Sequence, residues 1–197
     1  MKRKFMAQAK KKLDISCTAT DCNSGLHCFR ATKEMVIQNK GGTCQKCGIQ
    51  LVDWERIHSR DLHDVKNTFT MLKLEKVRHF FWHLPLSQHA VNHSRRKGKN
   101  GLREHVKKHL STAIGAAHPW HDGFQTPMTE DAPTAIAYGQ HATATCCRKC
   151  LEYWHGIPLG QQLGNQDLDY LTELVCLYLE DRIPNLTEAG EKIPPIR

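Results

Sequence analysis

The chain has 197 residues, 40% of them hydrophobic, and a formal net charge of +8. This composition excludes disordered and collagen-like polymers. No apolar run approaches the roughly 18 residues that a membrane-spanning helix needs, so we expect no membrane partner. The basic start MKRKFMAQAKKK lacks a following apolar stretch and does not match a secretory signal, which favours a cytoplasmic location. Nine cysteines and thirteen histidines are unusual, and in cytoplasmic proteins clustered thiols more often hold metal than form disulfides.

Composition divides the chain into four segments. Residues 1–12 form a basic arm, since they offer almost nothing to bury. Residues 13–58 are rich in Cys, Gly and Thr, which predicts loops and short strands held by zinc. Residues 59–184 predict a helical domain, and residues 185–197 a C-terminal tail. The expected fold is mainly α, one compact helical domain with an N-terminal zinc-stapled subdomain of loops and short strands; an α+β fold is the alternative.

Apolar residues at helical spacing place the expected helices, and Gly, Pro and Thr predict loop over residues 115–140. In chain order the expected helices run from about Ser59 to Pro85, from Ser87 to Arg96 before a turn at 97–101, from Leu102 to Ile114, from Cys146 or Cys147 to about His155, and from Gln166 to Arg182.

The run Cys44-Gln-Lys-Cys47-Gly48 is the strongest metal signal in the chain. Two thiolates separated by two residues can face one ion when the backbone forms a tight turn, and Gly48 permits that turn. Zinc takes four such ligands, so a second pair must come from upstream. Free buried thiols are the alternative. We predict a structural zinc held by Cys17, Cys22, Cys44 and Cys47, with Cys28 as the alternate ligand.

A second group of candidate ligands lies between His141 and His155. If a helix begins at Cys147, then Cys147 and Cys150 project from one face of its first turn, where the helix N-terminus favours thiolates. The alternative is that the thiols are core residues and the histidines only cap and pack. We predict a metal site formed by His141, Cys147, Cys150 and His155, with Cys146 as the alternate ligand. The chain would then bind one or two Zn²⁺ ions.

The run from Gln140 to Pro158 reads QHATATCCRKCLEYWHGIP and follows DGFQTP at 122–127. It resembles an uncharacterised bacterial family, a domain of unknown function with a HATATCCR-x-CL-x-x-WH-x-IP signature, over residues 100–182. The resemblance implies a bacterial or phage origin and no particular chemistry. It marks His141, Cys146, Cys147, Cys150, Trp154 and His155 as the signature, with Asp122, Gln125 and Thr126 as partners across a cleft.

Residues 73–109 carry ten Lys or Arg and two acidic residues. Such a basic segment favours a polyanionic partner, and nucleic acid is the commonest. The sequence therefore predicts a zinc-binding cytoplasmic protein that binds nucleic acid through a basic helical surface. The expected phosphate contacts are Arg78, Arg95, Arg96, Lys97, Lys99, Arg103, Lys107 and Lys108.

Two alternative functions remain open, so the sequence does not decide whether the protein is an enzyme. The first is a metal-dependent hydrolase, an HNH-like nuclease in which His118, His121 and Asp122 are the catalytic candidates beside the second cysteine group. Thiolate-rich sites, however, are more often closed and structural. The second is a subunit of a larger complex, which docks on a protein partner through its acidic C-terminal helix.

Overall fold

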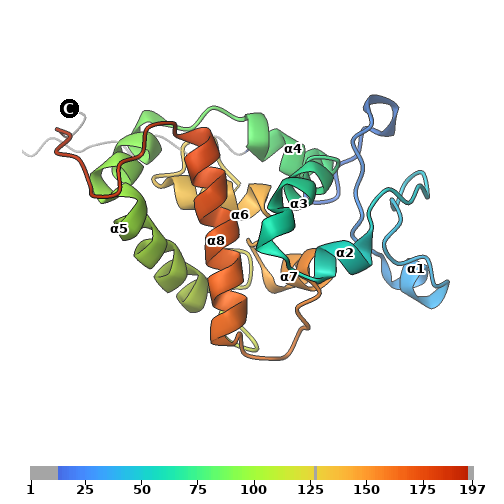
Figure 1. Cartoon of the computed structure of the whole chain (residues 1–197). Coiled ribbons are helices and arrows are strands. Elements are labelled where there is room, and N and C mark those ends of the chain that lie inside the picture. The colour runs from blue at the N-terminus through green and yellow to red at the C-terminus, as the bar shows by residue number, and fades with distance from the viewer. Residues whose placement is uncertain (1–12, 127, 195–197) are drawn as a thin grey trace, which may run out of the picture.

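The computed structural model describes residues 13–126 and 128–194, which are mainly helical (Figure 1). Within these ranges, β pairing is limited to isolated bridges such as Asp21–Leu26 and His27–Glu75. The predicted mainly α fold is confirmed, while short helices and single bridges stand where short strands were expected. The predicted basic arm at 1–12 lies outside the described residues. The elements are η1 (Cys22–Ser24), α1 (Lys33–Ile37), α2 (Trp54–His58), η2 (Leu62–Asp64), α3 (Val65–Leu72), α4 (Lys76–His83), α5 (Gln88–Ile114), α6 (Ala135–Ala142), α7 (Arg148–His155) and α8 (Asn165–Arg182).

The helix expected from Ser59 to Pro85 is divided into several pieces, of which α3 and α4 are the longest. The division between these two falls at Glu75, whose backbone is extended (φ −90°, ψ 125°). Here the backbone N–H of His27 donates to Leu74 at 2.7 Å, and its carbonyl accepts from Lys76 at 2.9 Å. The N-terminal segment therefore forms hydrogen bonds with backbone groups of Leu74 and Lys76 that would have been paired within the helix if it were continuous.

α5 spans both the second and the third expected helix, with a kink at Gly98 where the turn was predicted. Gly98 has φ 64° and ψ 178°, a conformation that residues with a side chain rarely adopt. A Cβ there would lie 2.5 Å from the backbone carbon of Ala189. The segment after α8 crosses this kink, with N–H of Lys99 donating to Thr187 and N–H of Glu191 donating to Arg95, both at 2.9 Å.

Helix α6 is an element that the sequence prediction missed, because residues 115–140 were expected to be loop. It is almost entirely buried and packs against α4 and α8. A Cβ on Gly139 would lie 3.0 Å from Cγ1 of Val175, so a small residue is needed for α6 to approach α8. Tertiary packing has overridden the weak local preference of a short Gly- and Thr-containing segment.

Two clusters of buried side chains form the interior. The larger one joins α4, α5, α6 and α8, and Figure 1 shows α5 and α8 lying side by side with α6 behind them. The smaller cluster combines N-terminal residues such as Phe29 and Ile57 with Cys150 and Trp154 of α7. The N-terminal part and α7 therefore share one buried interior. No described helix is long and apolar enough to cross a membrane.

Candidate metal centres

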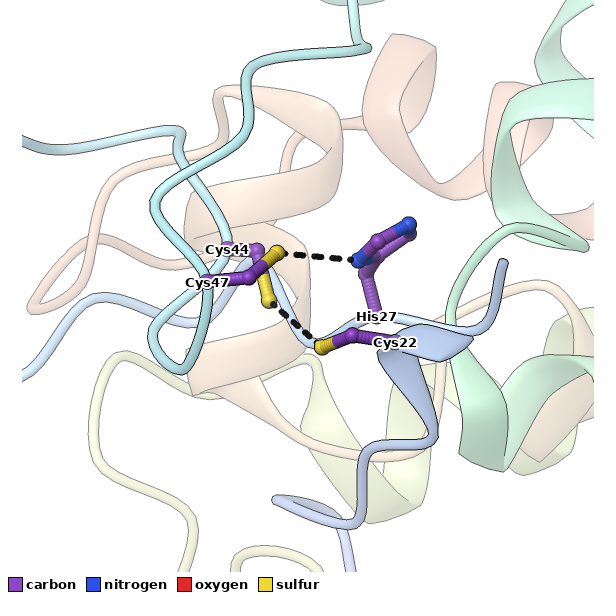
Figure 2. A group of neighbouring side chains, drawn as sticks. All are labelled: Cys22, His27, Cys44 and Cys47. Carbon is purple, nitrogen blue, oxygen red and sulfur yellow. Dashed lines mark hydrogen bonds between the residues drawn. The ribbon is translucent and has the colours of Figure 1, made fainter. Parts of the chain in front are cut away.

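Three thiols and one imidazole from the N-terminal part of the chain converge on one point (Figure 2). Their ligand atoms all lie within 4.8 Å of one another. His27 and Cys44 are buried, Cys22 is half-buried and Cys47 is exposed. We call Cys22, His27, Cys44 and Cys47 the four-ligand cluster.

The spacing of the four-ligand cluster fits a tetrahedral zinc ion. The Sγ atoms of Cys22 and Cys44 are 3.8 Å apart, and Sγ of Cys47 lies 3.5 Å from Nδ1 of His27. Zinc bonds of about 2.3 Å to sulfur and about 2.0 Å to nitrogen, at a tetrahedral angle, would place these atom pairs about 3.8 Å and about 3.5 Å apart. These two pairs therefore stand at the separations that the ion requires, and the remaining pairs lie within 4.8 Å.

Two tight turns bring these ligands together. In the first, Asp21 and Leu26 exchange backbone hydrogen bonds of 2.7 and 3.0 Å, and Gly25 takes φ 73°. In the second, N–H of Gly48 donates to the carbonyl of Cys44 at 2.8 Å, and Gly48 takes φ 74°. Both glycines occupy the left-handed region, where a side chain would be strained.

The surroundings of Cys44 favour the thiolate form that binds zinc. Burial acts to raise its pKa, but hydrogen bonds from nearby backbone groups and from the His27 ring outweigh burial and lower the pKa to about 6. Cys22 behaves oppositely, because desolvation and hydrogen bonds with the neighbouring thiols raise its pKa to about 11. Holding Cys22 as a thiolate beside Cys44 therefore needs a cation near both, and binding that cation would release a proton.

Among the described residues, Cys17 and Cys28 are not members of the four-ligand cluster. Cys28 is buried, donates from Sγ to the carbonyl of Cys17 at 3.6 Å and accepts from Nε2 of Gln45 at 2.8 Å. His27 occupies the position that the sequence analysis gave to Cys17. The sequence signal for His27 was that four residues separate it from Cys22, a spacing that suits a pair of zinc ligands. The prediction favoured a fourth thiol and therefore left His27 out.

A second group of sulfur atoms lies at the N-terminal end of α7, and we call Cys146, Cys147 and Cys150 the three-thiol cluster. Sγ of Cys150 lies 3.6 Å from that of Cys146 and 3.4 Å from that of Cys147. Hydrogen bonds from both neighbouring thiols, and then the charge of Arg78, hold the pKa of Cys150 well below its usual range despite burial. Cys147 is the least buried of the three.

Arg78, expected to contact phosphate, is fully buried beside the three-thiol cluster, so it does not belong to a nucleic-acid surface. Its Nη2 donates to Sγ of Cys150 at 3.1 Å, and its Nε donates to Oε2 of Glu75 at 3.1 Å. Glu75 also accepts from the Tyr153 hydroxyl at 2.9 Å and from Nε1 of Trp154 at 2.8 Å. This buried ion pair was not visible in the sequence, because only the fold brings α4 and α7 together.

His141 and His155, predicted as ligands with Cys147 and Cys150, are held elsewhere. Nε2 of His141 lies 2.9 Å from the carbonyl of Thr126, and its ring stacks on Phe81 with centroids 4.5 Å apart. Nε2 of His155 lies 2.9 Å from the carbonyl of Thr143, and its Nδ1 lies 3.2 Å from the Tyr170 hydroxyl. Burial lowers the pKa of His155 to about 4. Cys146, the alternate ligand, is the residue that joins the two thiols instead.

The three candidate catalytic residues of the nuclease alternative do not form a metal-binding group in the part of the chain that the structure describes. His118 and His121 are exposed. Oδ1 of Asp122 accepts from the backbone N–H of Arg148 at 2.8 Å, so it caps the N-terminus of α7. A Cβ on Gly123 would lie 3.3 Å from Cβ of Cys147. Asp122 and Gly123 therefore pack against the N-terminal end of α7.

Most of the cations that were expected to contact phosphate pair with acidic side chains of the same chain. Arg103 pairs with Glu173, Lys107 with Asp169 and Lys99 with Glu180, which joins α5 to α8. Arg95 pairs with Glu191 in the same way. The acidic side of α8, considered for a protein partner, therefore faces α5.

Three of the expected phosphate contacts, Arg96, Lys97 and Lys108, have no ion pair among the described residues. Lys97 and Lys108 line a hollow of about 450 Å³, whose other lining residues are Gly101, Glu104, His105, His109 and Thr112.

One family model matches the chain, that of a domain of unknown function designated DUF4186, over residues 66–180. The match contains the three-thiol cluster, whereas the four-ligand cluster lies N-terminal to it. No solved structure matches the chain.

Proposed function

Because the chain belongs to the DUF4186 family, for which no function is described, we propose its function from its own residues: it is a zinc protein that binds nucleic acid through one side of α5. The observation that carries the zinc assignment is the convergence of four ligand atoms within 4.8 Å in the four-ligand cluster, two pairs of which stand at tetrahedral separations. Thiolate and imidazole ligands in a tetrahedral arrangement select zinc over magnesium or calcium, which prefer oxygen.

The three-thiol cluster supports a second zinc ion. Its sulfur atoms are as close as ligands of one ion, and the Arg78 guanidinium places a positive charge against thiolates that would otherwise repel one another. All nine cysteines are free thiols, a state that a reducing compartment such as the cytoplasm maintains. We propose no reaction for either centre.

Metal content per chain, measured on protein purified without a histidine tag, tests this assignment. We expect two equivalents of zinc in the unaltered chain and one in both Cys44→Ser and Cys147→Ser. Cys176→Ser is the matched control, because Cys176 is buried in α8 away from both clusters, and should keep two equivalents. An unaltered chain without stoichiometric zinc would contradict the proposal.

The side of α5 that faces away from α8 carries the proposed nucleic-acid surface. Its exposed cations Arg96, Lys97 and Lys108 have no intramolecular ion pair among the described residues. Lys97 and Lys108 flank a hollow along the helix, and Arg96 lines a separate hollow with His89 and His93. Glu104 is the single acidic residue of the hollow that Lys97 and Lys108 flank. Unpaired cations release counterions from phosphate when they bind, which is the main source of affinity for nucleic acid.

Binding to a labelled oligonucleotide at a series of salt concentrations tests this surface. Each phosphate contact contributes about 0.9 to the slope of log K against log salt concentration. The variant Arg96→Gln/Lys97→Gln/Lys108→Gln should therefore lower the slope by roughly two to three and weaken binding at low salt. The matched control Arg103→Gln/Lys107→Gln removes two cations that are paired with α8 and should change the slope less. Equal slopes in the triple variant and the unaltered chain would exclude this surface.

A further inference from the structure

The three-thiol cluster presents one ligand fewer than a closed zinc site uses. Structural zinc sites in proteins are almost always four-coordinate, whereas sites with three protein ligands leave one position for water or substrate. His141 and His155, the predicted additional ligands, make other hydrogen bonds. The missing position must therefore be filled by another residue of this chain or by a small molecule.

Thr18, the residue after Cys17, shares a hollow with residues of α7, the helix that carries Cys150. This hollow has a volume of about 520 Å³, and α7 contributes Lys149, Glu152 and Tyr153 to its lining. The carbonyl of Cys17 accepts from the buried Sγ of Cys28 at 3.6 Å, which fixes the backbone at this point. Cys17 itself is half-buried. The backbone that carries the Cys17 side chain therefore borders the same hollow as α7.

The charges that act on the Cys17 thiol include that of Cys150 in the three-thiol cluster. Burial raises the pKa of Cys17, and the next largest effects are those of Arg78, which lowers it, and Cys150, which raises it. The thiol of Cys28 differs, since its pKa is raised to about 12 by burial and then by Glu75. Cys28 is also engaged by the side-chain amide of Gln45. Of the two cysteines left outside both clusters in this region, Cys17 is the one in electrostatic reach of Cys150.

We propose that Cys17 is the fourth ligand of the zinc ion held by Cys146, Cys147 and Cys150. This inference rests on the second metal of the proposed function and adds the residue that closes the site. Four thiolates around a divalent cation carry a net charge of −2, and the adjacent guanidinium of Arg78 offsets part of it. The ion would tie the N-terminal segment to α7, so that a residue outside the matched region 66–180 completes a site inside it.

Cadmium NMR of the full chain, with cadmium exchanged for zinc, tests the inference because the cadmium shift depends on the number of sulfur ligands. The unaltered chain should give two resonances, one from three sulfurs and one nitrogen and one from four sulfurs. In Cys17→Ser the four-sulfur resonance should move upfield while the other stays in place. In His27→Cys the opposite resonance should move, which assigns the two signals.

Cys28→Ser is the matched control, since it changes a neighbouring thiol and should move neither resonance. If Cys17→Ser also moves neither resonance, Cys17 is not a ligand and the inference is overturned. A single resonance in the unaltered chain that Cys147→Ser leaves unchanged would overturn the second metal itself, and so the two failures can be told apart.

Discussion

The guanidinium of Arg78 donates from Nη2 to Sγ of Cys150 at 3.1 Å, and both side chains are buried. A second nitrogen of the same guanidinium binds Glu75, so one arginine joins a carboxylate to the cluster of thiols. Removing a partner from a buried ion pair leaves an uncompensated charge, which costs far more than the pair contributes in total.

Arg78→Met should therefore lower the free energy of unfolding by about 3–5 kcal/mol, because Glu75 would remain charged and buried without its cation. Urea denaturation of the zinc-loaded protein measures this change. The double variant Arg78→Met/Glu75→Gln removes both charges and should recover part of the loss. An Arg78→Met variant as stable as the unaltered chain would show that the pair is not buried in solution.

His155 predicts a loss of stability in acid. The unfolded histidine has a pKa of about 6.5, whereas burial lowers the folded pKa to about 4. Below pH 6.5 the unfolded chain binds a proton that the folded chain does not, so the stability present above pH 6.5 falls as the pH approaches 4. The full effect is about 3 kcal/mol.

Zinc held by the proposed centres would be released in acid and add to the same trend, so the comparison must be made against His155→Gln. The glutamine amide keeps a donor for the carbonyl of Thr143 but does not titrate. Urea denaturation at pH 7 and pH 5 should show a larger loss in the unaltered chain than in the variant. Equal losses would mean that folding does not lower the pKa of His155.

Asp122 offers a test of the capping hydrogen bond at the start of α7. Its Oδ1 accepts from the first N–H of α7, so Asp122→Ala should lower stability by about 1 kcal/mol. Asp122→Asn keeps an acceptor oxygen and should lose only a few tenths of that amount. Thermal unfolding of the three proteins measures the difference. Equal losses in both variants would indicate that the negative charge, and not the hydrogen bond, is what matters.

Gly98→Ala should destabilise the protein strongly for two additive reasons. The residue needs φ 64°, and its new Cβ would lie 2.5 Å from the backbone of Ala189. We expect the segment after α8 to detach from the kink, with a loss of more than about 1 kcal/mol. Gly101→Ala is the control, since its Cβ would meet only the Lys97 side chain at ordinary contact distance. Faster hydrogen exchange at Lys99 and Glu191 would report the detachment.

The exposed ion pairs between α5 and α8 should contribute little to stability. Arg103 and Lys107 are both about half exposed in their pairs with Glu173 and Asp169, and pairs of this kind contribute about 0–1 kcal/mol. Arg103→Gln/Lys107→Gln should therefore stay folded at all salt concentrations, as urea denaturation would show. A large loss would mean that these pairs, and not the apolar contacts, hold α8 in place.

Periodicity and spacing predicted much of the helical fold but not its interruptions. The helices at α5, α7 and α8 follow regular apolar patterns, and the kink at Gly98 coincides with a glycine-containing turn signal. The break at Glu75 left no comparable signal, because its cause is the distant backbone of His27. Helix α6 was missed for the same reason, since its stability comes from contact with α4 and α8.

The candidate sites divide in the same way. The Cys44-x2-Cys47 spacing is local, and both predicted residues belong to the four-ligand cluster. The choice of His27 over Cys17 depends on which side chain a tight turn at Gly25 directs to the same point, and that requires three-dimensional information.

The isolated bridge between His27 and Glu75 links the two centres through only a few bonds. One side of it carries an imidazole of the first centre, and the other carries the carboxylate that holds the arginine of the second. We expect an ion that orders one side of the bridge to order the other, so that the two proposed zinc ions load with positive cooperativity. Loss of the ion from either proposed centre would then lower the affinity of the other centre for its own ion.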